Sequence, residues 1–173
     1  MTTKEFISKY YIQALRVSAI YNIPVTGILA QAAHESGYGN HAPGYNFFGI
    51  TAGSNWRGKR QLLKTREFHN SRNIRYPIII SIAWNAAKGG YEYIVRRYFR
   101  LYSSALWAFI DYANLISNNS RYQKALDYYL YPEKYLTEIA KAGYATDPNY
   151  LTKVLAVHRD IMNALNYLGL NEA

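Results

Sequence analysis

The segment from Pro24 to Gly37, PVTGILAQAAHESG, constrains the fold most, because it predicts a short helix with a carboxylate on its apolar side. Pro24 suits the first helical position, and Gly37 easily adopts the left-handed conformation that ends a helix. Ile28 and Ala32 recur at helical spacing, and Glu35 lies seven positions after Ile28, only about 20° further round the helix. We therefore expect the Glu35 side chain to point towards the protein body.

The position of Glu35 predicts a carboxyl group that resists ionisation. The last turn of a helix presents the negative end of the helix dipole, and burial also disfavours a charged carboxylate. Both effects raise the pKa towards neutrality, which is what a general acid needs. The alternative is a helix-end glutamate whose head group reaches water past Gly37.

The segment after the helix, GYGNHAPGYNFFGI at residues 37–50, is typical of an ordered loop. It contains four glycines and a proline, shows no hydrophobic period, and closes on an aromatic pair and a glycine. Loops of this kind border binding sites more often than regular elements do. We therefore expect Glu35 to lie beside a cleft.

Several motifs of this chain, in this order, resemble a known family. They are AQAAHESGYGN (30–40), YNFFGI (45–50), WRG (56–58), TREF (65–68), FRLYSS (99–104) and AGYATDPNY (142–150). The set resembles the bacterial N-acetylglucosaminidases of glycoside hydrolase family 73, which are peptidoglycan hydrolases of the flagellar and autolysin types. The ordered set is far more specific than any single motif.

This resemblance implies a lysozyme-like α+β fold, mainly helical, with a small β-lobe at about residues 56–102 that flanks the active-site cleft. Residues 1–173 would form a single glucosaminidase catalytic domain. The implied activity is that of an endo-β-N-acetylglucosaminidase, which cleaves the β-1,4 bond between N-acetylglucosamine and N-acetylmuramic acid in peptidoglycan.

Cleavage of a glycosidic bond needs a proton donor and usually a second group that activates water or stabilises positive charge. Most of the eleven carboxylates are predicted to cap helices or face solvent, which leaves Glu35, Glu67, Glu92 and Asp111. The resemblance implies that Glu35 is the catalytic acid and places a second acid at Glu67. The alternative for Glu67 is a cross-strand salt bridge.

The resemblance also implies that Tyr144, in the GYATDP motif, lines the cleft close to the acid. Its alternative is a loop aromatic that packs on the preceding helix. Four further residues are candidates for substrate contacts, although aromatic side chains after a loop also belong to cores: Tyr38, Asn46, Phe48 and Trp56.

Three segments of the β-lobe are strand-like, at 61–69, 76–84 and 91–102, with polar turns between them. The IIISI run in the middle segment is continuous rather than alternating, so it also fits a buried helix fragment. The insertion at 70–98 makes this region longer than in most of the family. Elsewhere, Thr2 with Glu5 predicts a capping box, and Asp147 with Pro148 predicts the start of a last helix that ends near Leu168.

The composition limits the partners. The formal charge of +9 favours an anionic partner, but the basic residues form no known nucleic-acid motif, so we expect peptidoglycan and no nucleic acid. No cysteine is present, and the four histidines lack metal-ligand spacing, so we expect neither a metal nor a cofactor. We expect a monomer without membrane insertion, and any immunity or delivery partner stays unidentified.

Two other functions remain open. A lytic transglycosylase or a muramidase would cut the muramic-side bond, and the presence of Glu67 argues mildly against the transglycosylase. A non-catalytic wall-binding module would keep the aromatic residues and the charge but lose the acid. We expect action on the cell wall or in the periplasm. The N-terminal residues do not resemble a signal peptide, which leaves the export route open.

Overall fold

The structure is a computed structural model and describes residues 1–170. It divides into two compact units. Residues 1–48 together with the chain from Tyr102 onward form the helical unit, and Gly49–Leu101 form the β unit. The predicted β-lobe at about 56–102 corresponds to the β unit, whose first residue lies seven positions earlier.

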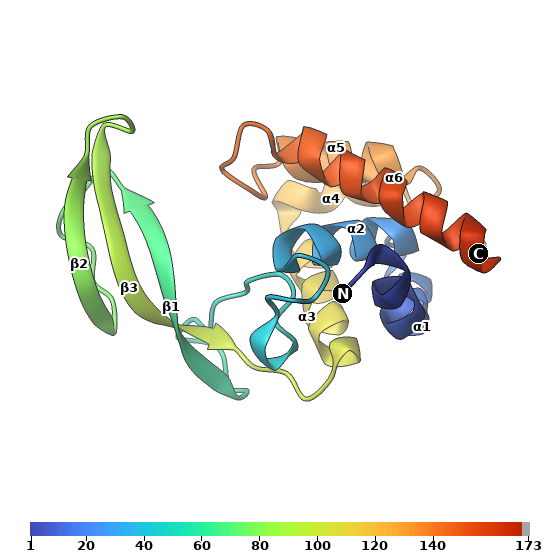
Figure 1. Cartoon of the computed structure of the whole chain (residues 1–173), viewed down its shortest axis with the longest axis horizontal. Coiled ribbons are helices and arrows are strands. Elements are labelled where there is room, and N and C mark those ends of the chain that lie inside the picture. Colours follow the sequence, from blue (N-terminus) through green and yellow to red (C-terminus); the bar gives the residue numbers. More distant parts are fainter. Residues whose placement is uncertain (171–173) are drawn as a thin grey trace. The chain divides into compact units, whose positions relative to one another are not determined.

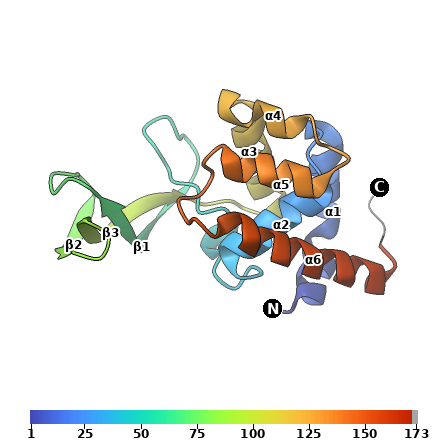
Figure 2. The ribbon, with the colours of Figure 1, turned by 90° about the horizontal axis from the view of Figure 1, so that it is seen from above.

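The helical unit contains six α-helices within the described residues. They are α1 (Thr3–Tyr21), α2 (Val25–Ser36), α3 (Ala105–Ser117), α4 (Gln123–Leu126), α5 (Pro132–Lys141) and α6 (Tyr150–Leu168). Helix α2 packs against α1, α5 and α6 and is buried along most of its length (Figures 1 and 2). None of the helices in the described part of the chain is long and apolar enough to cross a membrane.

Local sequence explains where α1 and α2 begin and end. Thr2 and Glu5 form the predicted capping box, in which the Glu5 carboxylate accepts a 2.7 Å hydrogen bond from the Thr2 backbone N–H. Helix α2 starts one residue later than predicted, with Pro24 as the N-cap, and Gly37 ends it in the left-handed conformation at φ 56°.

The start of α6 differs from the prediction. Asp147 accepts a hydrogen bond from the backbone N–H of Asn149 at 2.9 Å, and the ammonium of Lys153 contacts its other oxygen at 2.6 Å. Asp147 therefore forms a turn stabilised by its own side chain, and the helix begins at Tyr150 with Asn149 as the N-cap.

The core of the helical unit is largely aromatic. The rings of Tyr10 and Phe47 meet edge to face at 5.0 Å between centroids, and Phe47 lies 5.4 Å from Phe109. Phe6 and Phe109 are fully buried in this cluster. The cluster joins α1, α3 and the loop after α2.

The β unit is a three-stranded antiparallel sheet in the order β1-β3-β2 (Figure 1). The strands are β1 (Arg60–His69), β2 (Ile78–Asn85) and β3 (Gly90–Arg100). The IIISI run forms the edge strand β2, with an irregularity in register between Ile79 and Ser81. The alternative of a buried helix fragment is wrong, because the side chains of Ile78, Ile79 and Ile80 are exposed.

One face of the sheet is covered by the loop at residues 70–77. The hydroxyl of Tyr93 donates a 2.9 Å hydrogen bond to the backbone carbonyl of Ser71, and the ring of Tyr93 packs against His69 and Tyr76. Tyr93 and Val95 are fully buried there and form the small core of this unit.

Candidate active site

Glu35 occupies the last turn of α2, next to the left-handed residue Gly37. Ile28 and Ala32, on the same side of the helix, are fully buried and fix α2 in the core. The Glu35 side chain is itself exposed, so the expectation that it points into the protein body holds only in part. Desolvation nevertheless raises the pKa of Glu35 to about 7. These two observations agree if water reaches the carboxyl group from one side while protein surrounds the other sides.

A buried hydrogen-bond network supports α2 one turn before Glu35. Gln31 is fully buried, and its Nε2 donates a 2.9 Å hydrogen bond to the hydroxyl of Tyr150. Its side-chain oxygen accepts a hydrogen bond from the hydroxyl of Tyr112, which also lies 2.7 Å from the hydroxyl of Tyr135. The side-chain amide of Gln31 therefore both donates and accepts a hydrogen bond, which avoids the cost of an unpaired buried polar group.

Tyr144 joins this cluster from the turn between α5 and α6. Its ring stacks on Tyr150 at 5.9 Å between centroids and lies 6.1 Å from Tyr122 and 6.4 Å from Tyr112. Burial, followed by the negative charge of Glu35, raises the pKa of Tyr144 well above its usual value, and the same two causes raise the pKa of Tyr150. Both hydroxyls therefore stay protonated near Glu35 and can donate hydrogen bonds.

His34 also contacts the ring of Tyr150, edge to face at 5.4 Å between centroids. Burial lowers the pKa of His34, and the ammonium of Lys153 lowers it further. Its imidazole is therefore neutral at pH 7. Within residues 1–170, no group of three or more His, Asp or Glu side chains is placed to hold a metal ion.

The other predicted residues of the helical unit lie in different environments. Phe48 is 6% exposed and stacks on Tyr112 at 4.1 Å, and Asn46 is 5% exposed. Both side chains are thus almost entirely buried, and their contact with a sugar stays a prediction. Tyr38 is half-buried, packs edge to face on Phe6 at 6.0 Å, and its hydroxyl donates a 3.4 Å hydrogen bond to Asp160.

Glu67 and Trp56 belong to the β unit. Glu67 lies on β1 and accepts a 3.0 Å hydrogen bond from the guanidinium of Arg97 on β3. The cross-strand salt bridge considered for Glu67 is therefore present. Trp56 is half-buried, its indole N–H donates a 2.9 Å hydrogen bond to the Lys59 carbonyl, and the guanidinium of Arg100 lies 4.4 Å from its ring centroid.

The structure thus brings Glu35 and Tyr144 together within one unit, and sequence reasoning missed the residues that join them. These are Gln31, Tyr112, Tyr135 and Tyr150. One signal for Gln31 was available, because a polar residue four positions before Glu35 falls on the same side of an otherwise apolar helix. The tyrosines carried no local signal.

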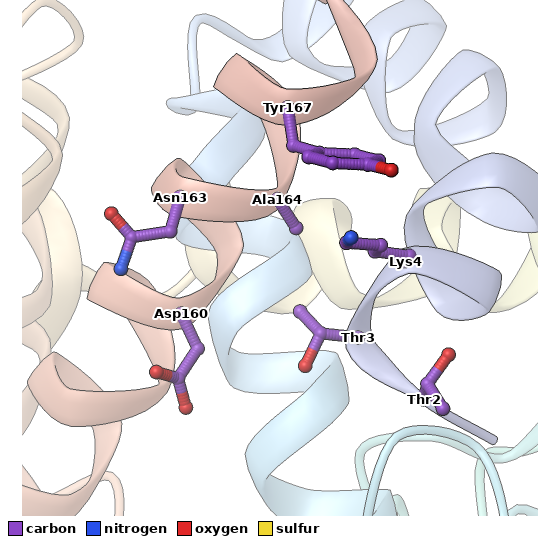
Figure 3. Close-up of a pocket in the computed structure, with 7 residues that line it drawn as sticks. All are labelled: Thr2, Thr3, Lys4, Asp160, Asn163, Ala164 and Tyr167. Atoms are coloured by element: carbon purple, nitrogen blue, oxygen red, sulfur yellow. The ribbon is translucent and has the colours of Figure 1, made fainter.

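A separate hollow lies between the start of α1 and the end of α6 (Figure 3). Its volume is about 500 Å³, and residues lining it include Thr3, Asp160 and Tyr167. The ammonium of Lys4 lies 3.1 Å from the centroid of the Tyr167 ring. None of the predicted site residues lines this hollow, so we assign it no part in the chemistry.

A glutamate of raised pKa at the end of a buried helix, in a helical unit whose chain is interrupted by a β unit, is the arrangement expected of a lysozyme-like glycoside hydrolase. The sequence model of the Glucosaminidase family, described as mannosyl-glycoprotein endo-beta-N-acetylglucosaminidase, matches residues 11–163. The chain belongs to this family.

Curated relatives and solved structures agree with this assignment. The chain is 35% identical over 159 residues to the peptidoglycan hydrolase FlgJ of Escherichia coli K12, which covers 88% of this chain and 44% of the relative. It is 32% identical over 164 residues to FlgJ of Pseudomonas aeruginosa PAO1, which covers 91% of this chain and 36% of the relative. The chain therefore spans less than half the length of these two relatives.

The fold is similar to that of the glycoside hydrolase domain of FlgJ from Salmonella typhimurium, with a TM-score of 0.74 and 29% identity over 98% of this chain and 94% of the other. It is also similar to a mutant of the peptidoglycan hydrolase from Sphingomonas sp. A1, with a TM-score of 0.68 and 27% identity over 95% of this chain and 99% of the other.

The raised pKa of Glu35 predicts a pH-dependent stability. A carboxyl whose pKa is about 7 in the folded protein, against an ordinary 4.5, destabilises the fold progressively as the pH rises through that interval. We expect Glu35→Gln to raise the melting temperature by a few degrees above neutral pH and to leave it unchanged in acid. Thermal unfolding followed by circular dichroism across this range tests the prediction.

The matched control is Asp127→Asn, which changes an exposed carboxylate of the same unit. This variant should show no rise in melting temperature that depends on pH in the neutral range. Equal pH profiles for the two variants would mean that Glu35 is well hydrated in solution.

Proposed function

We propose that this chain is the catalytic domain of a peptidoglycan hydrolase, acting as an endo-β-N-acetylglucosaminidase on the β-1,4 bond between N-acetylglucosamine and N-acetylmuramic acid. The observation that carries this proposal is Glu35, a carboxyl at a helix end whose pKa desolvation raises to about 7. Membership of the Glucosaminidase family and similarity to proteins named peptidoglycan hydrolases support the same substrate. The site of action is then the cell wall or the periplasm.

In the proposed mechanism, Glu35 donates its proton to the glycosidic oxygen as the bond to the anomeric carbon breaks. A pKa near 7 leaves a large protonated fraction at neutral pH, and the proton is released readily in the transition state. The hydroxyl of Tyr144 stays protonated and serves as a hydrogen-bond donor beside the acid, directed at the sugar or its acetamido group.

Glu67 is the proposed second carboxylate. Its carboxyl group accepts a hydrogen bond from the guanidinium of Arg97, and a carboxylate held in this way can activate water as a base or stabilise the oxocarbenium-like transition state by its charge. We further propose that residues 1–173 work as a single catalytic domain and as a monomer, with Tyr38 and Trp56 as substrate contacts.

The first test of this function is product analysis. Purified peptidoglycan is digested with the wild type and with Glu35→Gln, reduced with borohydride and analysed by mass spectrometry. We expect reduced N-acetylglucosamine ends from the wild type and a loss of at least about 10³-fold in the variant, because glutamine cannot donate the proton. Anhydro-muramic or reduced muramic ends would show that the enzyme cleaves the muramic-side bond instead. No new ends from the wild type would indicate a non-catalytic binding module.

The rate of hydrolysis should also depend on pH through Glu35. Since the acid must be protonated, we expect kcat/KM to fall as the pH rises through about 7. The release of reducing ends from soluble peptidoglycan fragments, measured across the neutral range, tests this. A profile with no decline above neutral pH would contradict Glu35 as the proton donor.

The role of Glu67 can be separated from its salt bridge by a matched control. Glu92 is the other carboxylate of the β unit; it lies 3.7 Å from Arg66 and has a similarly covered side chain, at 27% exposure against 23% for Glu67. We expect Glu67→Gln to lower kcat by about 10²-fold or more and Glu92→Gln to change it by less than about twofold. Similar activities for the two variants would reduce Glu67 to a structural role.

A further inference from the structure

The net positive charge of this chain comes from one of its two units. Of its 20 Lys and Arg residues, 11 lie between Gly49 and Leu101, together with only two carboxylates, Glu67 and Glu92. The β unit therefore carries a formal charge of +9, which is the charge of the whole chain. The remaining sequence has nine basic and nine acidic residues and is neutral. Such a separation points to an anionic partner for the β unit.

The same unit has an exposed apolar edge. On the edge strand β2, Ile78, Ile79 and Ile80 are 44%, 42% and 50% exposed, and Trp84 is 58% exposed. Ile78 is the register partner of Arg96 and Ile79 that of Val95, so their side chains lie on opposite faces of the sheet and both sides of this edge expose apolar surface. Natural proteins usually avoid or cover an exposed apolar edge strand. A function that uses this apolar edge would explain its presence.

Basic residues surround this edge. Arg75 precedes β2 by three residues, Lys88 follows its last residue by three, and Arg96 is the register partner of Ile78 on β3. All three side chains are exposed. We name these residues the β2 edge: Ile78–Ile80, Trp84, Arg75, Lys88 and Arg96.

Anionic phospholipid is the partner whose chemistry matches the whole β2 edge. Lysine and arginine bind lipid phosphates, tryptophan favours the interface between headgroups and acyl chains, and isoleucine gains free energy by leaving water. A soluble polyanion would satisfy the charges and leave the isoleucines in water. A second copy of the chain would cover the isoleucines but would bring together two units of charge +9.

We propose that the β2 edge docks the protein on an anionic lipid surface, where the strand lies on the membrane without spanning it. The basic residues contact headgroup phosphates, and the side chains of Ile78–Ile80 and Trp84 enter the interface. This docking does not depend on the glycosidase activity. A failure of vesicle binding would therefore leave the proposed hydrolase function standing, and a failure of peptidoglycan digestion would leave the docking proposal standing.

Vesicle binding tests the proposal on the whole chain. Vesicles of equal parts phosphatidylglycerol and phosphatidylcholine should bind the wild type, and pure phosphatidylcholine should not. Replacing Ile78, Ile79 and Ile80 together by Ser should weaken binding at least about tenfold, because three apolar side chains no longer leave water. The matched control is Ile20→Ser, which alters an isoleucine of the neutral unit that is 71% exposed and should leave binding unchanged.

The charges are tested separately. Arg75→Gln and Lys88→Gln should each weaken binding to the anionic vesicles about fivefold. The control Lys134→Gln removes an exposed charge from the helical unit and should have no effect. Equal losses of vesicle affinity for all three variants would mean that net charge alone attracts the protein to the vesicles, and would overturn the proposal that the β2 edge docks on lipid.

Fluorescence provides a readout that does not require the triple variant to fold. Anionic vesicles should shift the emission of the wild type to shorter wavelength, and Trp84→Phe should abolish the shift while Trp107→Phe, which changes a residue that is 57% exposed on α3, keeps it. Three results would overturn the proposal: no binding to anionic vesicles, binding to long-chain polyphosphate as tight as to vesicles and unaffected by the isoleucine changes, or self-association that the isoleucine changes remove.

Discussion

The buried amide of Gln31 joins α2 to two helices from distant parts of the chain. It donates to Tyr150 on α6 and accepts from Tyr112 on α3, whose hydroxyl also contacts that of Tyr135 on α5. An unpaired polar group at any of these buried positions costs about 1–3 kcal/mol, so the four helices are favoured in one mutual arrangement. Because Glu35 lies one turn further along α2, this network also fixes the part of the helix backbone that carries the Glu35 side chain.

The sequence predicted the local features of the fold and missed those that depend on distant contacts. The capping box of Thr2 and Glu5 and the left-handed end of α2 at Gly37 follow from residues a few positions apart. The hydrogen-bond partners of Gln31 lie 81 and 119 residues away along the chain. Local sequence patterns do not indicate which residues so far apart come into contact. The burial of Phe48 has the same cause, since its stacking on Tyr112 crosses from a loop to α3.

One prediction failed and one alternative was excluded, because in each case a local pattern had more than one physical solution. An Asp-Pro pair favours a helix start, but the second oxygen of Asp147 binds Lys153, and the helix begins later, at Tyr150. A continuous apolar run usually indicates burial, but Ile78–Ile80 form an exposed edge strand. For Glu35, the sequence identified the candidate acid and the direction of its pKa shift, whereas the tyrosine hydroxyls around it required the structure.

The distribution of charge accounts for the different environments of the two candidate carboxylates. Desolvation alone raises the pKa of Glu35, and no basic side chain counteracts it. A nearby cation would stabilise the ionised form and lower the pKa, so a neutral helical unit suits a proton donor. Glu67 lies in the basic unit, where its carboxyl group contacts the guanidinium of Arg97 at 3.0 Å. With most of the basic residues in the inserted β unit, burial sets the pKa of Glu35, whereas Glu67 is paired with Arg97.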